Sequence, residues 1–151
     1  MRLLVCGGRH FDHRELLEKV LDQVLANSTA SDLVLVHTGA MGAAAIANAW
    51  ARGKTAFRPD SIAVLEFKDL MPRVHLPPRG IDNAMTERRR AIFDEGKPQV
   101  VFFFPMRAND MRTDEDLVEE AERRAIPVRR FRWTERLNPN PAPEAPKETG
   151  T

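Results

Sequence analysis

Short runs of consecutive apolar residues alternate with segments of helical periodicity along most of this chain. Runs of this length, bounded by glycine, proline or charged residues, predict β-strands that are buried in a sheet. The predicted strands are residues 3–6, 33–36, 62–67, 100–104 and 128–133. The run 100–104 is the most hydrophobic and predicts a central strand buried on both faces, whereas 128–133 predicts an edge strand.

Apolar residues recur at helical spacing in the segments that follow these strands. The predicted helices are residues 13–25, 42–52, 83–95 and 113–125. At the first helix, Asp12 is the expected N-cap and Glu15 completes a capping box, while Phe11 packs onto Leu16. The second helix is rich in alanine and apolar nearly all round, so we expect it to pack closely against the sheet.

Strands and helices that alternate on this scale imply right-handed crossovers and a parallel sheet covered by helices on both faces. The sequence therefore predicts a single-domain α/β fold: a doubly wound, Rossmann-like, mainly parallel sheet of about five strands. We expect this domain to span residues 1–137. Residues 138–151 are rich in proline and have no large apolar side chain, so they predict a disordered tail.

Composition narrows the class of protein further. A length of 151 residues with 42% hydrophobic residues suits one domain with a full core. The 23 Lys and Arg residues against 22 Asp and Glu leave a net charge of +1, which disfavours a strongly basic nucleic-acid-coating protein. Cys6 is the single cysteine, so intrachain disulfides are excluded. With no long apolar run and no signal-peptide pattern at the N-terminus, we expect a cytoplasmic protein without a membrane partner.

Two glycine-containing turns follow the first two predicted strands, at residues 7–9 and 38–42. Ligands of doubly wound sheets bind beyond the carboxyl ends of the strands, and free N–H groups at a helix N-terminus favour anions. We therefore expect the two turns to face each other across one crevice that binds a phosphate, with Arg9 beside it. Tight turns use glycine without any ligand as well. Neither turn matches a dinucleotide-binding G-x-G-x-x-G or a P-loop, which disfavours a conventional dinucleotide or ATP site.

Four stretches of the sequence resemble one known family: LLVCGGRHFDHRELL, VHTGAMGAAAIANAWARG, ERRRAIFDEGKPQVVFFFP and AIPV. They are similar to the YspA-like branch of the SLOG superfamily, which is Rossmann-like and related to Smf/DprA and LOG domains. The resemblance implies a pocket for a nucleotide or nucleotide-derived ligand. Positions that match the family's motifs are Gly7, Gly8, Arg9, Gly39, Gly42, Arg88 and Thr113. Thr38, which replaces a glycine, and Arg107, in the turn after the fourth strand, complete the predicted ligand-binding set.

The departures from the family pattern affect the predicted activity. Met41 replaces an arginine, Ala44 replaces an acidic residue, and the usual Pro-Gly-Gly-x-Gly-Thr turn is replaced by the longer segment 105–113. We therefore expect a non-catalytic binder or sensor without a cofactor and with no catalytic residues. Loop 106–112 is expected to act as a mobile lid that closes Arg107 or Arg112 over an anion, or else as a subunit interface.

Several alternatives remain open at this point. A LOG-type phosphoribohydrolase is disfavoured by the missing glycine turn and by the missing acid at position 44, and the acids at 114–116 are interpreted as helix-dipole partners. Single-stranded DNA binding through arginines 88–90 and the basic residues of 123–132 is disfavoured by the acids around them. His10 and His13 lack further ligands, so no metal site is predicted, and His37 is expected to be a hydrogen-bonded core histidine. The resemblance also implies a homo-oligomer, a dimer or higher, and the altered pocket leaves open a self-associating scaffold that binds no ligand.

Overall fold

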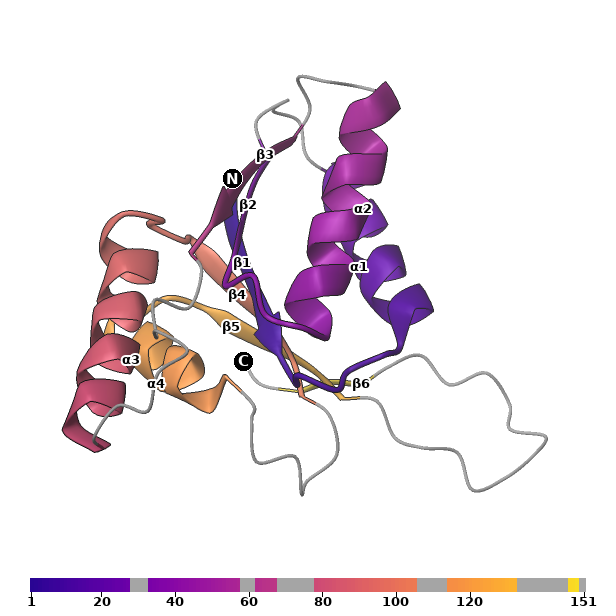
Figure 1. Ribbon diagram of the computed structural model, residues 1–151. Coiled ribbons are helices and arrows are strands. Elements are labelled where there is room, and N and C mark those ends of the chain that lie inside the picture. The colour runs from indigo at the N-terminus through magenta and orange to yellow at the C-terminus, as the bar shows by residue number, and fades with distance from the viewer. Residues whose placement is uncertain (28–32, 58–61, 68–77, 106–113, 133–146, 150–151) are drawn as a thin grey trace.

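The computed structural model describes residues 1–27, 33–57, 62–67, 78–105, 114–132 and 147–149 of the chain. In these ranges a central sheet carries helices on both faces: α1 and α2 cover one face, and α3 and α4 cover the other (Figure 1). The strands are β1 (Arg2–Gly7), β2 (Leu33–His37), β3 (Ile62–Glu66), β4 (Val100–Phe104), β5 (Val128–Arg132) and β6 (Lys147–Thr149). The helices are α1 (Arg14–Asn27), α2 (Ala43–Phe57), α3 (Pro78–Asp94) and α4 (Glu115–Arg123).

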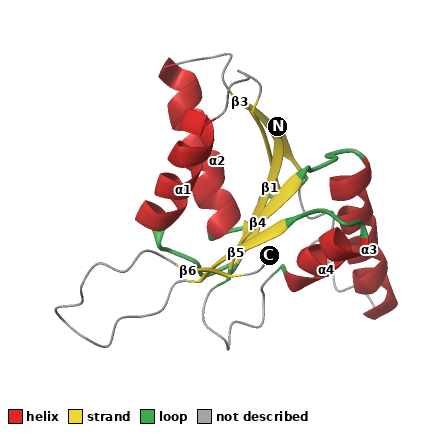
Figure 2. Ribbon diagram, turned by 180° about the vertical axis from the view of Figure 1, so that it is seen from behind, coloured by secondary structure: helices red, strands yellow, loops and turns green. Residues whose placement is uncertain are grey.

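The strand order is β3-β2-β1-β4-β5-β6, and β1 to β5 are all parallel. Figure 2 shows this sheet edge-on between the two helical layers. From β1 the chain runs outward through β2 to β3 and then returns to place β4 on the other side of β1. The strand order therefore reverses between β1 and β4, where doubly wound sheets bind their ligands. The predicted Rossmann-like α/β fold is confirmed.

Alternate residues of the strands enter two separate cores, as the two-residue period of a strand requires. Leu3 and Val5 of β1 pack with α1 and α2, whereas Leu4 and Cys6 pack with α3 and α4. Phe102 and Phe104 of β4 belong to the first core, and its residues Val101 and Phe103 belong to the second. The prediction that β4 is a central strand buried on both faces is thus confirmed.

The structure differs from the sequence prediction at the outer strand and beyond it. β6 pairs antiparallel with β5, so β5 is not an edge strand and that prediction was wrong. The sequence pattern of β5 does not reveal a partner that comes from a proline-rich segment. The described part of the predicted tail, Lys147–Thr149, forms β6, and the rest of that segment lies outside the described residues.

The N-terminus of α1 is capped one residue later than the sequence predicted. The helix begins at Arg14, and Nδ1 of His13 accepts the N–H of Leu16 at 3.1 Å. A histidine nitrogen at the N-cap does what the Asp12 carboxylate was expected to do, because it satisfies one of the free N–H groups of the first turn. Helix α3 also begins earlier than predicted, at Pro78. Within the described residues, no helix is both long enough and apolar enough to cross a membrane.

Phe104 lies at the centre of an aromatic group that joins β4 to β5 and to the start of α1. It is fully buried, stacks on Phe131 with ring centroids 4.9 Å apart, and meets Phe11 at 5.5 Å. We expect Phe104→Ala to lower the free energy of unfolding by about 3–5 kcal/mol, because it leaves a cavity in the core. Phe104→Leu, which keeps most of the volume, should cost roughly 1.5 kcal/mol or less. Urea denaturation measures both, and equal stability of the two variants would contradict this packing.

Candidate functional site

The turn between β1 and α1 is fixed by backbone contacts to its neighbours. The N–H of Gly8 donates to the carbonyl of Phe104 at the end of β4 (2.9 Å). The Gly8 carbonyl accepts the N–H of Phe11 (3.1 Å) and that of Ala43 at the start of α2 (3.4 Å). A Cβ on Gly7 would overlap the Phe104 carbonyl, so a glycine is needed for β4 to approach this closely. The first predicted turn is therefore the point at which β1, β4 and α2 meet.

The turn between β2 and α2 lies directly against the first turn. Gly42 has a φ of 79°, and a Cβ there would overlap the Gly8 carbonyl oxygen and lie 2.6 Å from that of Arg9. Thr38 is buried, and its Oγ1 accepts the N–H of Ala40 at 3.3 Å, which shapes the start of the turn. The two turns are thus in contact, so a ligand would lie over both of them and not in a gap between them.

His37 supports this second turn from the end of β2. Its Nδ1 accepts the N–H of Gly39 at 3.0 Å, and Gly39 has a φ of 75°. Burial lowers the pKa of His37, opposed by the negative charge of Glu66, and a neutral ring is needed for Nδ1 to accept. The prediction that His37 is a hydrogen-bonded core histidine is confirmed.

Arg9 and Met41 are exposed side chains of the joined turns. Arg9 makes no ion pair or side-chain hydrogen bond with any residue that the structure describes. Met41 is 63% exposed. The joined turns therefore offer a cationic group and an apolar group to solvent at the carboxyl ends of β1 and β2.

A buried acidic residue lies behind the first turn, and its role goes beyond the helix-dipole interaction that its sequence position predicted. Asp114 is the N-cap residue of α4, and its Oδ2 accepts the N–H of Gly7 at 3.2 Å. Its Oδ1 lies 3.9 Å from Nη2 of Arg88 on α3, and the two side chains are 15% and 10% exposed. The earlier interpretation of Asp114 was thus incomplete. Its position in the sequence carried a signal for this role. Asp114 begins the helix that follows β4, and β4 lies beside β1 at the switch point of the sheet.

The protonation of Asp114 is shifted by this environment. Burial raises the pKa of Asp114 to about 6, because the charged carboxylate loses solvation. The N–H of Gly7 and the Arg88 guanidinium act in the opposite direction, and the negative charge of Asp116 raises the pKa further. Asp114 therefore changes its charge near neutral pH, which an exposed aspartate does not do.

The predicted ligand-binding residues fall into two groups. Gly7, Gly8, Arg9, Thr38, Gly39 and Gly42 all belong to the joined turns. Arg88 lies on the opposite face of the sheet beside Asp114, and Gly7 connects the two groups through its N–H. Arg107 and Thr113, together with the predicted lid 106–112, lie outside the described residues.

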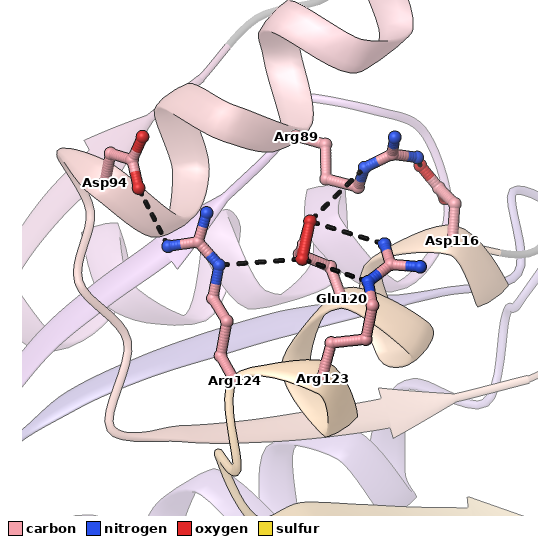
Figure 3. Close-up of polar contacts among 6 residues, drawn as sticks. All are labelled: Arg89, Asp94, Asp116, Glu120, Arg123 and Arg124. Carbon is pink, nitrogen blue, oxygen red and sulfur yellow. Dashed lines mark hydrogen bonds and ion pairs between the residues drawn. The ribbon is translucent and has the colours of Figure 1, made fainter.

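Ion pairs between α3 and α4 occupy the basic residues next to this site (Figure 3). Glu120 lies at their centre: its carboxylate is 3.3 Å from Arg123 Nε, 3.6 Å from Arg124 Nε and 3.8 Å from Arg89 Nε. These arginines, led by the hydrogen bond from Arg123, lower the pKa of Glu120 despite its partial burial. The network ties the two helices together with charges that satisfy one another.

Other basic residues of these helices and of β5 are paired in the same way. Arg90 lies 3.2 Å from Glu87, and Arg130 lies 2.7 Å from Glu122. Arg124 also pairs with Asp94 at 2.8 Å and lies over the ring of Phe93, 5.2 Å from its centroid. Six of the arginines proposed as contacts for nucleic-acid phosphates thus already lie beside carboxylates: Arg88, Arg89, Arg90, Arg123, Arg124 and Arg130.

The described residues offer no cluster of three or more His, Cys, Asp or Glu side chains that could hold a metal ion. His13, for which the sequence predicted no metal site, uses its Nδ1 to cap α1. The chemistry of the candidate site is therefore that of backbone amides, arginines and one buried carboxylate.

The contact between the two turns generates a prediction for glycine variants. We expect Gly42→Ala to destabilise the protein by about 1–3 kcal/mol, because the residue has a positive φ and the methyl group would meet the backbone of the first turn. Gly53→Ala is the matched control. Its Cβ would meet nothing within 4 Å inside α2, so it should be neutral or stabilise by roughly 0.5–1 kcal/mol. Thermal and urea denaturation measure both, and equal effects of the two variants would contradict the contact.

A known protein family matches the part of the chain that contains the joined turns. No curated protein and no solved structure matches the chain. Residues 1–60, which span β1 through α2 and include both turns, match the family model described as the YspA, cpYpsA-related SLOG family. The match does not extend to Arg88 or Asp114. Over residues 1–60, the chain is thus similar to the YspA, cpYpsA-related SLOG family, in agreement with the resemblance seen in its sequence.

Proposed function

We propose that this chain binds a nucleotide-derived small molecule over the joined turns and acts as a binder or sensor rather than as an enzyme. The observation that carries the proposal is the direct contact of two glycine turns at the carboxyl ends of adjacent parallel strands, with the exposed Arg9 beside them. The site lies next to the switch point between β1 and β4, where folds of this type bind ligands. The SLOG match over residues 1–60 supports a nucleotide-related domain.

The groups at the turns suit a ligand with an anionic part and an apolar part. The N-terminus of α2 lies at the second turn. The N–H of Ala43 donates to the Gly8 carbonyl, but the positive end of the helix dipole and the Arg9 guanidinium both favour a phosphate. Met41, exposed on the same turn, can contact the face of a base, because thioethers pack well on aromatic rings. This combination is the chemistry of a nucleotide.

The surroundings of the acidic residues favour binding over catalysis. Asp114 accepts the Gly7 N–H, and Asp116 lies 3.6 Å from Arg89. A general acid or base needs a position within hydrogen-bond reach of the reacting group. In this structure Asp114 Oδ2 faces the Gly7 N–H, and Asp116 Oδ2 is buried beside the Arg89 guanidinium without a hydrogen bond to it. The paired arginines of α3, α4 and β5 likewise speak against nucleic-acid binding, since phosphates would have to compete with their carboxylates.

Arg9→Ala tests the proposed phosphate contact. Loss of one charged hydrogen bond should weaken binding of a nucleoside monophosphate by about 1.5–3 kcal/mol, or roughly 10–150-fold. Titration calorimetry with AMP, GMP, CMP and UMP measures the affinity, and native mass spectrometry of freshly purified protein reports any co-purified ligand and the oligomeric state. Arg52→Ala, an exposed arginine further along α2, is the control and should bind like wild type. Equal affinity of Arg9→Ala and wild type would remove Arg9 from the site.

We expect no release of free base when the purified chain is incubated with nucleoside monophosphates. The reason is that the described carboxylates at the switch point face Gly7 and arginines of the chain and not the joined turns, where we propose that the ligand binds. Chromatography of the reaction mixture checks this. Turnover that Asp116→Asn abolishes and Asp94→Asn leaves unchanged would show an enzyme and overturn the non-catalytic proposal.

A further inference from the structure

Two groups that favour anions converge behind the first turn. The N–H of Gly7, at the end of β1, and the guanidinium of Arg88, on α3, both face the N-terminus of α4. Backbone amides, an arginine and a helix N-terminus together form the kind of site that holds oxyanions. In this protein a carboxylate of the chain itself, that of Asp114, occupies the position between them.

Arg88 is poorly satisfied by this internal carboxylate. Its side chain is only 10% exposed, its Nη2 lies 3.9 Å from Asp114 Oδ1, and its buried Nε has no hydrogen-bond partner in the part of the chain that the structure describes. A guanidinium presents five N–H donors, and leaving buried donors without acceptors costs free energy. An oxyanion with several acceptor oxygens would satisfy Arg88 better than the single distant carboxylate does.

Asp114 is also held poorly in its charged form. Among the described residues, the ionisable groups that face it are Cys6 on β1, Arg88 on α3 and Asp116 on α4, and of these only Arg88 carries a positive charge. Burial and the two neighbouring acids raise the pKa of the Cys6 thiol, so Cys6 stays neutral. With burial and Asp116 acting against one arginine and one amide, the pKa of Asp114 is raised to about 6.

We propose that Gly7 N–H and Arg88 form an oxyanion subsite that Asp114 fills as an internal counter-ion, and that an anionic group of the ligand enters by displacing this carboxylate. The inference deepens the proposed function, because the subsite shares Gly7 with the joined turns. Two anions cannot both occupy the subsite. Binding is therefore coupled to the uptake of one proton from solvent by the Asp114 carboxylate, and it is stronger at acidic pH.

Sulfate is the probe for this subsite, because it keeps its double charge over the pH range of interest, whereas phosphate titrates within it. Calorimetry on the full wild-type chain, at constant ionic strength, compares about pH 5 with about pH 7.5. If only the form with neutral Asp114 admits the anion, a pKa of about 6 predicts roughly 30-fold weaker sulfate binding at the higher pH.

Variants separate the carboxylate from other causes of pH dependence. Asp114→Asn removes the charge and keeps an oxygen that can accept the Gly7 N–H. We expect it to bind sulfate at about pH 7.5 at least tenfold more tightly than wild type, with no pH dependence, while Asp114→Asn combined with Arg88→Gln should lose the binding. Asp94→Asn is the matched control, because Asp94 is also ion-paired to an arginine, Arg124, but does not contact Gly7. It should follow wild type at both pH values.

Equal sulfate affinity of the wild-type chain at the two pH values would overturn the proposal, even if Asp114→Asn failed to fold. Asp114→Asn binding sulfate no better than wild type would overturn it as well and leave Asp114 as a structural link between β1 and α4. These failures differ from failure of the proposed function. Nucleotide binding that depends on Arg9 but not on pH refutes only the subsite, and pH-dependent sulfate binding without nucleotide binding refutes only the nucleotide proposal.

Discussion

The close approach of backbone on both sides of Gly7 and Gly8 is the constraint on which the rest of the molecule depends. β4 contacts this turn through the Phe104 carbonyl, α2 through Ala43 and Gly42, and α4 through Asp114. Side chains at Gly7 or Gly42 would push these elements apart, so the absence of a Cβ at both positions lets the sheet, both helical layers and the candidate site meet at one place. The same few atoms therefore hold the fold together and form the proposed ligand site, and glycines that look like a ligand motif are first a condition for the fold.

Charge is distributed differently on the two faces of the sheet. On the α1 and α2 face the candidate site is formed by backbone, and the exposed Arg9 is the cation that we propose for it. On the α3 and α4 face, ion pairs centred on Glu120 satisfy one another. Asp114 and Arg88 lie between these arrangements and are less well compensated than either, because their ion pair is long and both are mostly buried. Incomplete compensation of buried charges is typical of functional sites, whereas complete pairing is typical of helix–helix contacts.

The sequence by itself determined the fold class and the first half of the candidate site. Apolar runs of strand length alternate with amphipathic segments, and a doubly wound sheet buries both faces of such strands under helices. Five parallel strands follow from that pattern. Turns that end adjacent parallel strands must lie at the same edge of the sheet, so the neighbourhood of Gly8 and Gly42 was predictable too. The helix cap at His13 was missed because an aspartate stands one position earlier and has the stronger intrinsic preference.

Only the tertiary structure decided which elements receive partners from distant parts of the chain. The β5–β6 pairing joins segments separated by a proline-rich stretch, and the β-propensity of the individual residues does not indicate such a contact. The same holds for Asp114, because an acid at the start of a helix is expected from sequence to interact with the helix dipole. Its buried carboxylate accepts the N–H of Gly7 because β1 and β4 are adjacent in the fold. Local spacing determines which residues share a face of a helix or strand. The burial of a side chain and the compensation of its charge depend on the residues that the fold places opposite it. Burial and charge compensation in turn decide the chemistry of the site.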